Sequence, residues 1–167
     1  MAVFSVYAQA LQYPYPGQVE ALQAQVKDST NEPGMKTFAN FIQKIGALSL
    51  SEQEELFTHT FDLSPLTAPY IGYQIWGESY KRGEFMALIS QEMSSNQIDL
   101  EGELPDHLRL VLRYLAVAPT PLPELVEVLD PALAAMQKSL KKNEADNPYL
   151  LLLEAIAQAC KSLAVAG

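Results

Sequence analysis

Apolar residues recur every three to four positions along most of this chain, and this spacing constrains the fold more than any other feature. Side chains at i, i+3 and i+4 share one face of an α-helix, so each such stretch predicts a helix with a buried side. No stretch shows the sustained alternation of Val, Ile and Thr that a half-buried strand needs. The sequence therefore predicts an all-α fold. The pattern is clearest in the stretches 38–48, 85–93, 108–115, 122–129 and 133–140.

Capping and proline signals divide the pattern into separate helices. Ser51 with Glu54 fits a capping box, and Asn147-Pro148 is a suitable start for the last helix. The alternate prolines of residues 119–123 predict a stiff connector, and Pro131 is expected to begin or kink the helix that follows. The predicted helices span 2–12, 18–27, 33–48, 52–61, 70–76, 79–94 and 106–117, with more after the connector and after residue 148.

Size and composition fit a single domain over residues 1–167. An apolar content of 49% excludes a disordered chain. The chain has 11 Lys and Arg against 20 Asp and Glu, a net charge of −9, which argues against a nucleic-acid partner and suits a basic one. The lone Cys160 excludes an internal disulfide and suits a reducing compartment.

The N-terminus lacks the charged start of a signal peptide, and no apolar run approaches the ~20 residues that a membrane span needs. We therefore expect a cytoplasmic protein with no stable membrane insertion.

The signatures of common enzymes are missing. No glycine-rich phosphate loop or nucleophile elbow occurs, and His59 and His107 are the only histidines, so a zinc cluster is not predicted. Asp106 and His107 are disfavoured as a hydrolytic dyad because adjacent helical residues point about 100° apart and no nucleophile accompanies them. Cys160 is interpreted as buried packing. The sequence predicts neither an enzyme nor a bound cofactor or metal.

Two segments are unusual in composition. Residues 70–83 hold three tyrosines, the only tryptophan, three of the eight glycines and a Lys-Arg pair, which fits either a tight helix crossing or an open apolar groove. Residues 101–108 belong to an acidic run without Lys or Arg. Since acids are favoured at helix starts, Asp106 and His107 fit either a plain helix start or a polar anchor for a peptide. The residues alone leave both pairs of interpretations open.

These segments resemble the TorD/NarJ family of redox enzyme maturation proteins, which are dedicated chaperones of molybdenum-cofactor oxidoreductases. The nitrate reductase delta-subunit branch typically shows TFD, then HGE-x-x-x-RG, then ELPDHL. This chain reads TFD at 60–62, WGESYKRG at 76–83 and ELPDHL at 103–108. The order and spacing agree across residues 52–115. Trp76 departs from the branch, which usually has a histidine there.

The resemblance implies a compact helical bundle that is not part of the finished enzyme. Such proteins bind the N-terminal segment of the catalytic subunit, often a twin-arginine signal or its remnant, and hold the subunit until the cofactor is inserted. Such a leader is basic and then apolar, which suits helix-in-groove binding to an acidic chain. The alternative is a helical adaptor or oligomerisation module without a peptide groove. A monomer is expected, with a domain-swapped dimer as the other option.

The peptide-binding residues are expected to come from both unusual segments. Trp76 and Tyr73 lie three residues apart on one helix face, and Glu78 follows a glycine that can expose it. Asp106 and His107 begin a helix whose apolar face is anchored in the bundle, so their side chains are expected to project at the surface. The two elements are expected to flank one cleft. The predicted set is Tyr70, Tyr73, Trp76, Glu78, Glu101, Glu103, Asp106 and His107.

Overall fold

The computed structural model describes the backbone of residues 1–166 and the side chains of residues 1–163. Within these residues there is no strand, which confirms the all-α prediction. The π-helical turn η1 (Thr58–Asp62) and the 3-10 turn η2 (Pro65–Thr67) lie between α4 and α5. The α-helices are α1 (Val3–Ala10), α2 (Gln18–Asp28), α3 (Met35–Gly46), α4 (Leu50–Phe57), α5 (Ile71–Trp76), α6 (Tyr80–Ser95), α7 (Leu108–Val117), α8 (Pro123–Asn143) and α9 (Tyr149–Ala166).

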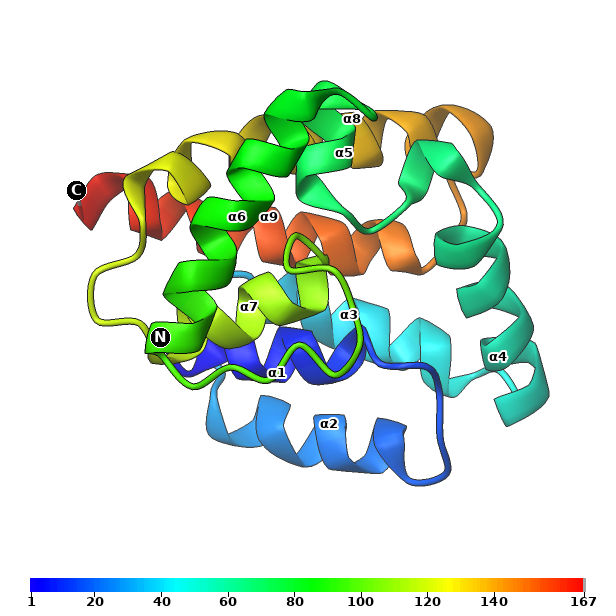
Figure 1. The fold of residues 1–167 in the computed structure, drawn as a ribbon. Helices are drawn as coiled ribbons and strands as arrows, with labels where there is room; N and C mark the ends of the chain where they lie inside the picture. Colours follow the sequence, from blue (N-terminus) through cyan, green and yellow to red (C-terminus); the bar gives the residue numbers. More distant parts are fainter. Residues whose placement is uncertain (167) are drawn as a thin grey trace.

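The helices form a bundle in which α9 packs against α8, α3 and α1, while α7 packs against α1 (Figure 1). In that view α2 lies along the lower edge and α6 crosses the front of the molecule. The apolar stripe that the sequence predicts for α7 is fully buried, from Leu108 to Leu115. None of the helices within the described residues has the length and apolarity required to cross a membrane.

An aromatic cluster joins α9 to the turn that follows α4. The ring of Tyr149 lies 4.9 Å from that of Phe61 and 5.4 Å from that of Phe41, measured between centroids. Burial raises the pKa of the Tyr149 hydroxyl well above its ordinary value, so the ring is a neutral part of the core. This cluster holds η1, and with it the TFD element, against the bundle.

The capping box of α4 lies two residues earlier than predicted. The Ser49 hydroxyl accepts a hydrogen bond from the Glu52 N–H at 3.1 Å, and the Glu52 carboxylate accepts one from the Ser49 N–H at 2.9 Å. The S-x-x-E pattern fits both registers, so Ser51 was the wrong choice. The earlier start buries Gln53, whose amide donates to the carbonyls of Ile45 and Leu48 at the end of α3. Satisfying these carbonyls favours the observed register.

Pro131 does not begin a helix, because it lies inside α8, which runs from Pro123 to Asn143. A proline within a helix removes one backbone hydrogen bond. Burial of Leu129 and Leu133 on either side of it stabilises the continuous helix against that loss. Cys160 is buried, as predicted, and burial raises the pKa of its thiol to about 12.

Candidate functional site

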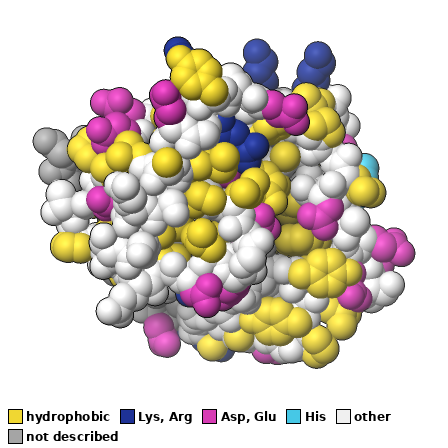
Figure 2. Space-filling view, in the orientation of Figure 1, with side chains coloured by type: hydrophobic (Ala, Val, Ile, Leu, Met, Phe, Trp, Pro, Cys, Tyr) yellow, Lys and Arg dark blue, Asp and Glu magenta, His cyan; other side chains and the backbone are white. Residues whose placement is uncertain are grey.

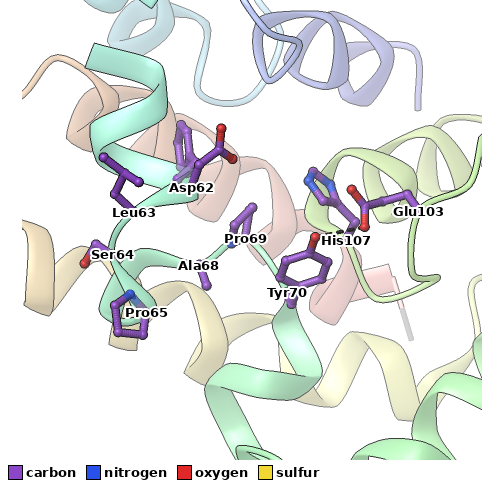
Figure 3. Close-up of a pocket in the computed structure, with 10 residues that line it drawn as sticks. Asp62, Leu63, Ser64, Pro65, Ala68, Pro69, Tyr70, Glu103 and His107 are labelled. Atoms are coloured by element: carbon purple, nitrogen blue, oxygen red, sulfur yellow. Dashed lines mark hydrogen bonds between the residues drawn. The ribbon is translucent and has the colours of Figure 1, made fainter. Parts of the chain in front are cut away.

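A half-open cavity of about 340 Å³ lies between the turns that follow α4 and the start of α7 (Figure 3). It brings together the TFD element and the ELPDHL element, which are about 40 residues apart in the sequence. Its lining combines aromatic rings, prolines and two carboxylates. The lining residues are Phe61, Asp62, Leu63, Ser64, Pro65, Ala68, Pro69, Tyr70, Glu103 and His107.

Backbone hydrogen bonds tie the two sides of this cavity together. The Ile71 N–H donates to the Asp106 carbonyl at 3.0 Å, and the Leu108 N–H donates to the Pro69 carbonyl at 2.7 Å. Tyr70 and His107 thereby form an isolated antiparallel bridge. A sequence with helical periodicity contains no signal for such a two-residue pairing, so this contact was not predicted.

Tyr70, Glu103 and His107 form one connected group in the cavity wall (Figure 3). The Tyr70 hydroxyl donates to the Glu103 carboxylate at 2.8 Å, and the Tyr70 ring meets the His107 ring edge-on at 5.1 Å. Burial, followed by the hydrogen bond to Glu103, raises the pKa of Tyr70 to about 12. Burial acts to raise the pKa of Glu103, but hydrogen bonds from the Leu104 N–H and Tyr70 outweigh it and hold that pKa low. The cavity therefore keeps a carboxylate at neutral pH.

His107 is the N-cap of α7 and is largely buried. Its Nδ1 accepts a hydrogen bond from the Arg109 N–H at 3.1 Å, which requires Nδ1 to be unprotonated. Burial lowers the pKa of the imidazole to about 4, despite the opposing field of Glu103. His107 is therefore a neutral cap near pH 7 and not a cationic anchor.

Asp106 does not project at the surface, and that prediction was wrong. Its side chain is fully buried and forms two hydrogen bonds with Arg82, from Nε at 2.9 Å and from Nη2 at 3.1 Å. A bidentate guanidinium supplies the pairing that a buried carboxylate needs. Because Arg82 lies in the WGESYKRG element, the ion pair joins that element to ELPDHL.

The chain packs closely around this ion pair. A Cβ built on Gly72 would lie 2.8 Å from Asp106 Oδ2 and 3.1 Å from Arg82 Cγ. The Arg82 guanidinium also lies over the rings of Tyr70 and Tyr73, 5.5 and 5.7 Å from their centroids. Tyr73 therefore faces the ion pair, not the cavity. The tight helix crossing, which was one of the two interpretations of residues 70–83, is present here.

The acidic character of residues 101–108 is partly neutralised by basic residues from elsewhere. Glu101 pairs with Arg109 and Arg113, with N–O distances of 3.2 Å for each. The chain has only three arginines, and all of them pair with a carboxylate of this segment. Sequence reasoning missed this pairing because Arg109 and Arg113 follow the acidic run and Arg82 lies on another helix.

Trp76 and Glu78 lie away from the cavity, contrary to the prediction of a single cleft. The Trp76 ring packs against Phe85 at 5.2 Å and borders a different hollow between α6 and α8. Glu78 is exposed. The structure therefore brings Tyr70, Glu103 and His107 together and leaves the other five predicted residues outside the cavity lining. It adds Asp62, which the TFD element itself could have indicated, and Leu63, which follows that element.

The fold and the site together define the class of protein: an all-helical bundle with a side cavity built from the TFD and ELPDHL elements. Comparison with known families places the chain more closely, because residues 23–150 match the family described as "Nitrate reductase delta subunit". The chain belongs to this family.

Two curated relatives carry chaperone names. The chain is 28% identical over 119 residues to the "Probable nitrate reductase molybdenum cofactor assembly chaperone NarJ" of Bacillus subtilis (strain 168), covering 69% of this chain and 65% of the relative. It is 29% identical over 109 residues to the "Nitrate reductase molybdenum cofactor assembly chaperone NarJ" of Escherichia coli (strain K12), covering 63% of this chain and 45% of that relative. The chain thus spans less than two thirds of either relative. Both relatives are named as chaperones, which agrees with the prediction that the chain is not an enzyme.

Proposed function

We propose that this chain is an assembly chaperone for a molybdenum-cofactor oxidoreductase. It binds the N-terminal, twin-arginine-like segment of the catalytic subunit in the cytoplasm and holds the subunit for cofactor insertion. Family membership and the chaperone names of the two relatives support this role. The proposal treats residues 1–167 as one domain that acts as a monomer.

The observation that carries the proposal is the composition of the cavity. Asp62 and Glu103 supply two carboxylates, and no Lys or Arg lines the space. Exposed leucines stand in or beside the same elements: Leu63 is 72% exposed and Leu104 is 44% exposed. Carboxylates beside exposed apolar side chains match a leader that is basic and then apolar. Figure 2 shows one face of the molecule, on which apolar areas lie beside separate acidic side chains and a few Lys or Arg side chains.

The residues of the site have different proposed roles. Tyr70, Glu103 and His107 are proposed to contact the leader because they line the cavity. Asp106 and Arg82 are positioning residues: their ion pair holds α7 against α5 and α6 beneath the wall. Trp76, Tyr73, Glu78 and Glu101 are not assigned to this cavity.

The net charge of the chain supports the same function, because it raises the rate at which the chain associates with a basic leader. A chain of charge −9 attracts a basic segment over several ångströms, which raises the rate of encounter at low ionic strength. The apolar part of the leader then slows dissociation, since related complexes differ mainly in the rate at which they separate.

Capture from the native host tests the proposal against the adaptor alternative. Tagged full-length chain is added to a host lysate, and the proteins retained are identified by mass spectrometry. The proposal predicts a molybdoenzyme catalytic subunit that still carries its N-terminal segment. Retention of that subunit is expected to fall with Glu103→Gln and to stay unchanged with Glu55→Gln, an exposed carboxylate on α4. Retention of this chain alone, as an oligomer, would support the adaptor alternative.

A further inference from the structure

The first half of α8 carries three carboxylates in a row on its exposed side. Glu124, Glu127 and Asp130 are spaced i, i+3 and i+6, so they follow one another over about 9 Å of helix. All three are exposed, and none has an ion-pair partner among the residues whose side chains the structure describes. We call this row the acidic ridge of α8. It differs from the segment 101–106, in which Glu101 and Asp106 pair with arginines.

Hollows border the acidic ridge on both sides. The first, of about 340 Å³, lies between α6 and α8. Its lining is half apolar and half charged: Trp76, Phe85, Leu88 and Val128, with Lys81, Glu84, Glu124 and Glu127. The second, of about 800 Å³, lies between α8 and the connector that follows α7. Glu127 lines both hollows, so the ridge separates two adjoining recesses that each contain apolar side chains.

The larger hollow has walls suited to apolar side chains. Leu115, Val126 and Leu163 contribute aliphatic surface, and the P-T-P-L-P run of residues 119–123 contributes prolines, which have no N–H to leave unsatisfied. Proline also fixes the shape of this wall, because its φ angle cannot vary freely. A partner segment that enters the hollow therefore meets a largely preformed surface and loses less free energy in ordering it.

We propose that the acidic ridge and its two hollows form a docking surface for a basic amphipathic helix of a partner protein. Apolar side chains of that helix occupy the hollows, and its Lys or Arg side chains pair with the three carboxylates of the ridge. Charge complementarity selects this occupant. Three carboxylates without partners repel an acidic helix, and a purely apolar helix leaves them desolvated and unpaired. The surface does not share a lining residue with the cavity of Tyr70, Glu103 and His107, so the inference does not depend on the proposed function.

A designed peptide tests this inference without knowledge of the natural partner. The probe is a fluorescein-labelled 18-residue helix with leucines on one face and lysines flanking them, and its counterpart carries glutamate in place of lysine. Anisotropy of each peptide is measured against full-length chain at physiological salt. We expect the lysine peptide to bind with a Kd of about 1–30 µM and the glutamate peptide to bind at least about 30-fold more weakly.

Charge reversal locates the binding on the ridge. The triple variant Glu124→Lys, Glu127→Lys, Asp130→Lys is compared with Asp28→Lys, Glu55→Lys, Asp146→Lys, which makes the same change in net charge at exposed acids elsewhere. The ridge variant is expected to weaken binding of the lysine peptide at least about tenfold, and the control at most about threefold, since distant charges are screened. Equal losses in the two variants would overturn the proposal, because binding would then follow net charge alone.

The apolar half of the proposal has its own test. Val126→Thr and Val128→Thr keep the branched shape of the side chain and introduce a hydroxyl into each hollow. Together they are expected to lower the affinity for the lysine peptide about fivefold. The variant is expected to stay folded, which its thermal unfolding transition checks. Unchanged affinity in this folded variant would contradict occupation of the hollows.

Discussion

Both carboxylate oxygens of Asp106 accept hydrogen bonds from Arg82. The Asp106 side chain is fully buried, while that of Arg82 remains 14% exposed. The pair joins the start of α7 to the first turn of α6. Because the backbone of Asp106 also accepts the N–H of Ile71, three elements meet at this residue. The ion pair therefore positions Tyr70 and His107, which stand on either side of the same junction.

The first prediction concerns the stability that this pair supplies. Asp106→Asn keeps the shape of the side chain and leaves the guanidinium without its counter-charge, so we expect the free energy of unfolding to fall by about 3 kcal/mol. The matched control is Asp62→Asn at an exposed carboxylate, with an expected change within about 0.5 kcal/mol. Urea unfolding curves provide both values. A loss below about 1 kcal/mol for Asp106→Asn would show that the pair is dispensable for folding.

A second prediction uses two glycines with opposite surroundings. A Cβ at Gly72 would meet Asp106 Oδ2 at 2.8 Å, whereas a Cβ at Gly83 would meet nothing within 4 Å. Gly72→Ala is therefore expected to destabilise the chain by about 1–3 kcal/mol through overpacking. Gly83→Ala, inside α6, is expected to stabilise it by about 0.5–1 kcal/mol through helix propensity. Thermal unfolding of both variants is the check, and equal effects would contradict the close packing at Gly72.

The third prediction is a pH dependence of stability from His107. Its pKa in the folded chain is about 4, below the roughly 6.5 of an unfolded histidine, because burial disfavours the charged ring. Between these values the unfolded state binds more protons, so stability is full above pH ~6.5 and is lost as the pH falls toward 4. The loss is of the order of 3 kcal/mol.

His107→Asn isolates this contribution to the pH dependence. Asparagine is a good N-cap and can accept the Arg109 N–H, but it does not titrate. The variant is expected to fold and to lose the slope of stability between pH ~6.5 and ~4.5. Carboxylates such as Glu103, whose pKa is also low, account for any slope that remains below that range. An unchanged slope in the variant would assign the dependence to other groups.

The helices of this chain were predictable where they bury a stripe with a 3.6-residue period. The burial of Leu108, Val111 and Leu115 on α7 follows directly from that spacing. Boundaries were less certain where two registers satisfy the same rule, as with Ser49 and Ser51. The expectation that Pro131 begins a helix was wrong, because the rule that prolines interrupt helices is local, while the burial that sustains α8 depends on its neighbours in space.

The candidate site was predicted in part, for a related reason. Tyr70, Glu103 and His107 do share a cavity, as expected of residues in the two unusual segments. Asp106 was placed at the surface because nothing near it in the sequence could pair with it. Its partner Arg82 is 24 residues away on another helix, and only the folded chain brings the two together. The same limit explains why Trp76 faces α6 and α8 instead of the cavity.

A fourth prediction follows from the charges of the proposed peptide site. Binding of a basic leader to the cavity is expected to weaken as ionic strength rises, since screening shortens the reach of surface charge to ~8 Å at physiological salt. Contacts with Leu63 and the aromatic wall are expected to leave a remainder that salt does not remove. Calorimetric titrations at several salt concentrations measure both parts. Affinity without any trend would remove the electrostatic contribution from the mechanism.

The most direct test of the proposed function is calorimetric titration of the full chain with the N-terminal peptide of the host's molybdoenzyme catalytic subunit. We expect saturable binding at a ratio of one to one, weakened about tenfold or more by Glu103→Gln, a cost of about 1–3 kcal/mol. Glu55→Gln, the control at an exposed carboxylate outside the cavity lining, is expected to bind as the unmodified chain does. Equal affinity of both folded variants, or no binding of the peptide at all, would contradict a leader-binding site at this cavity.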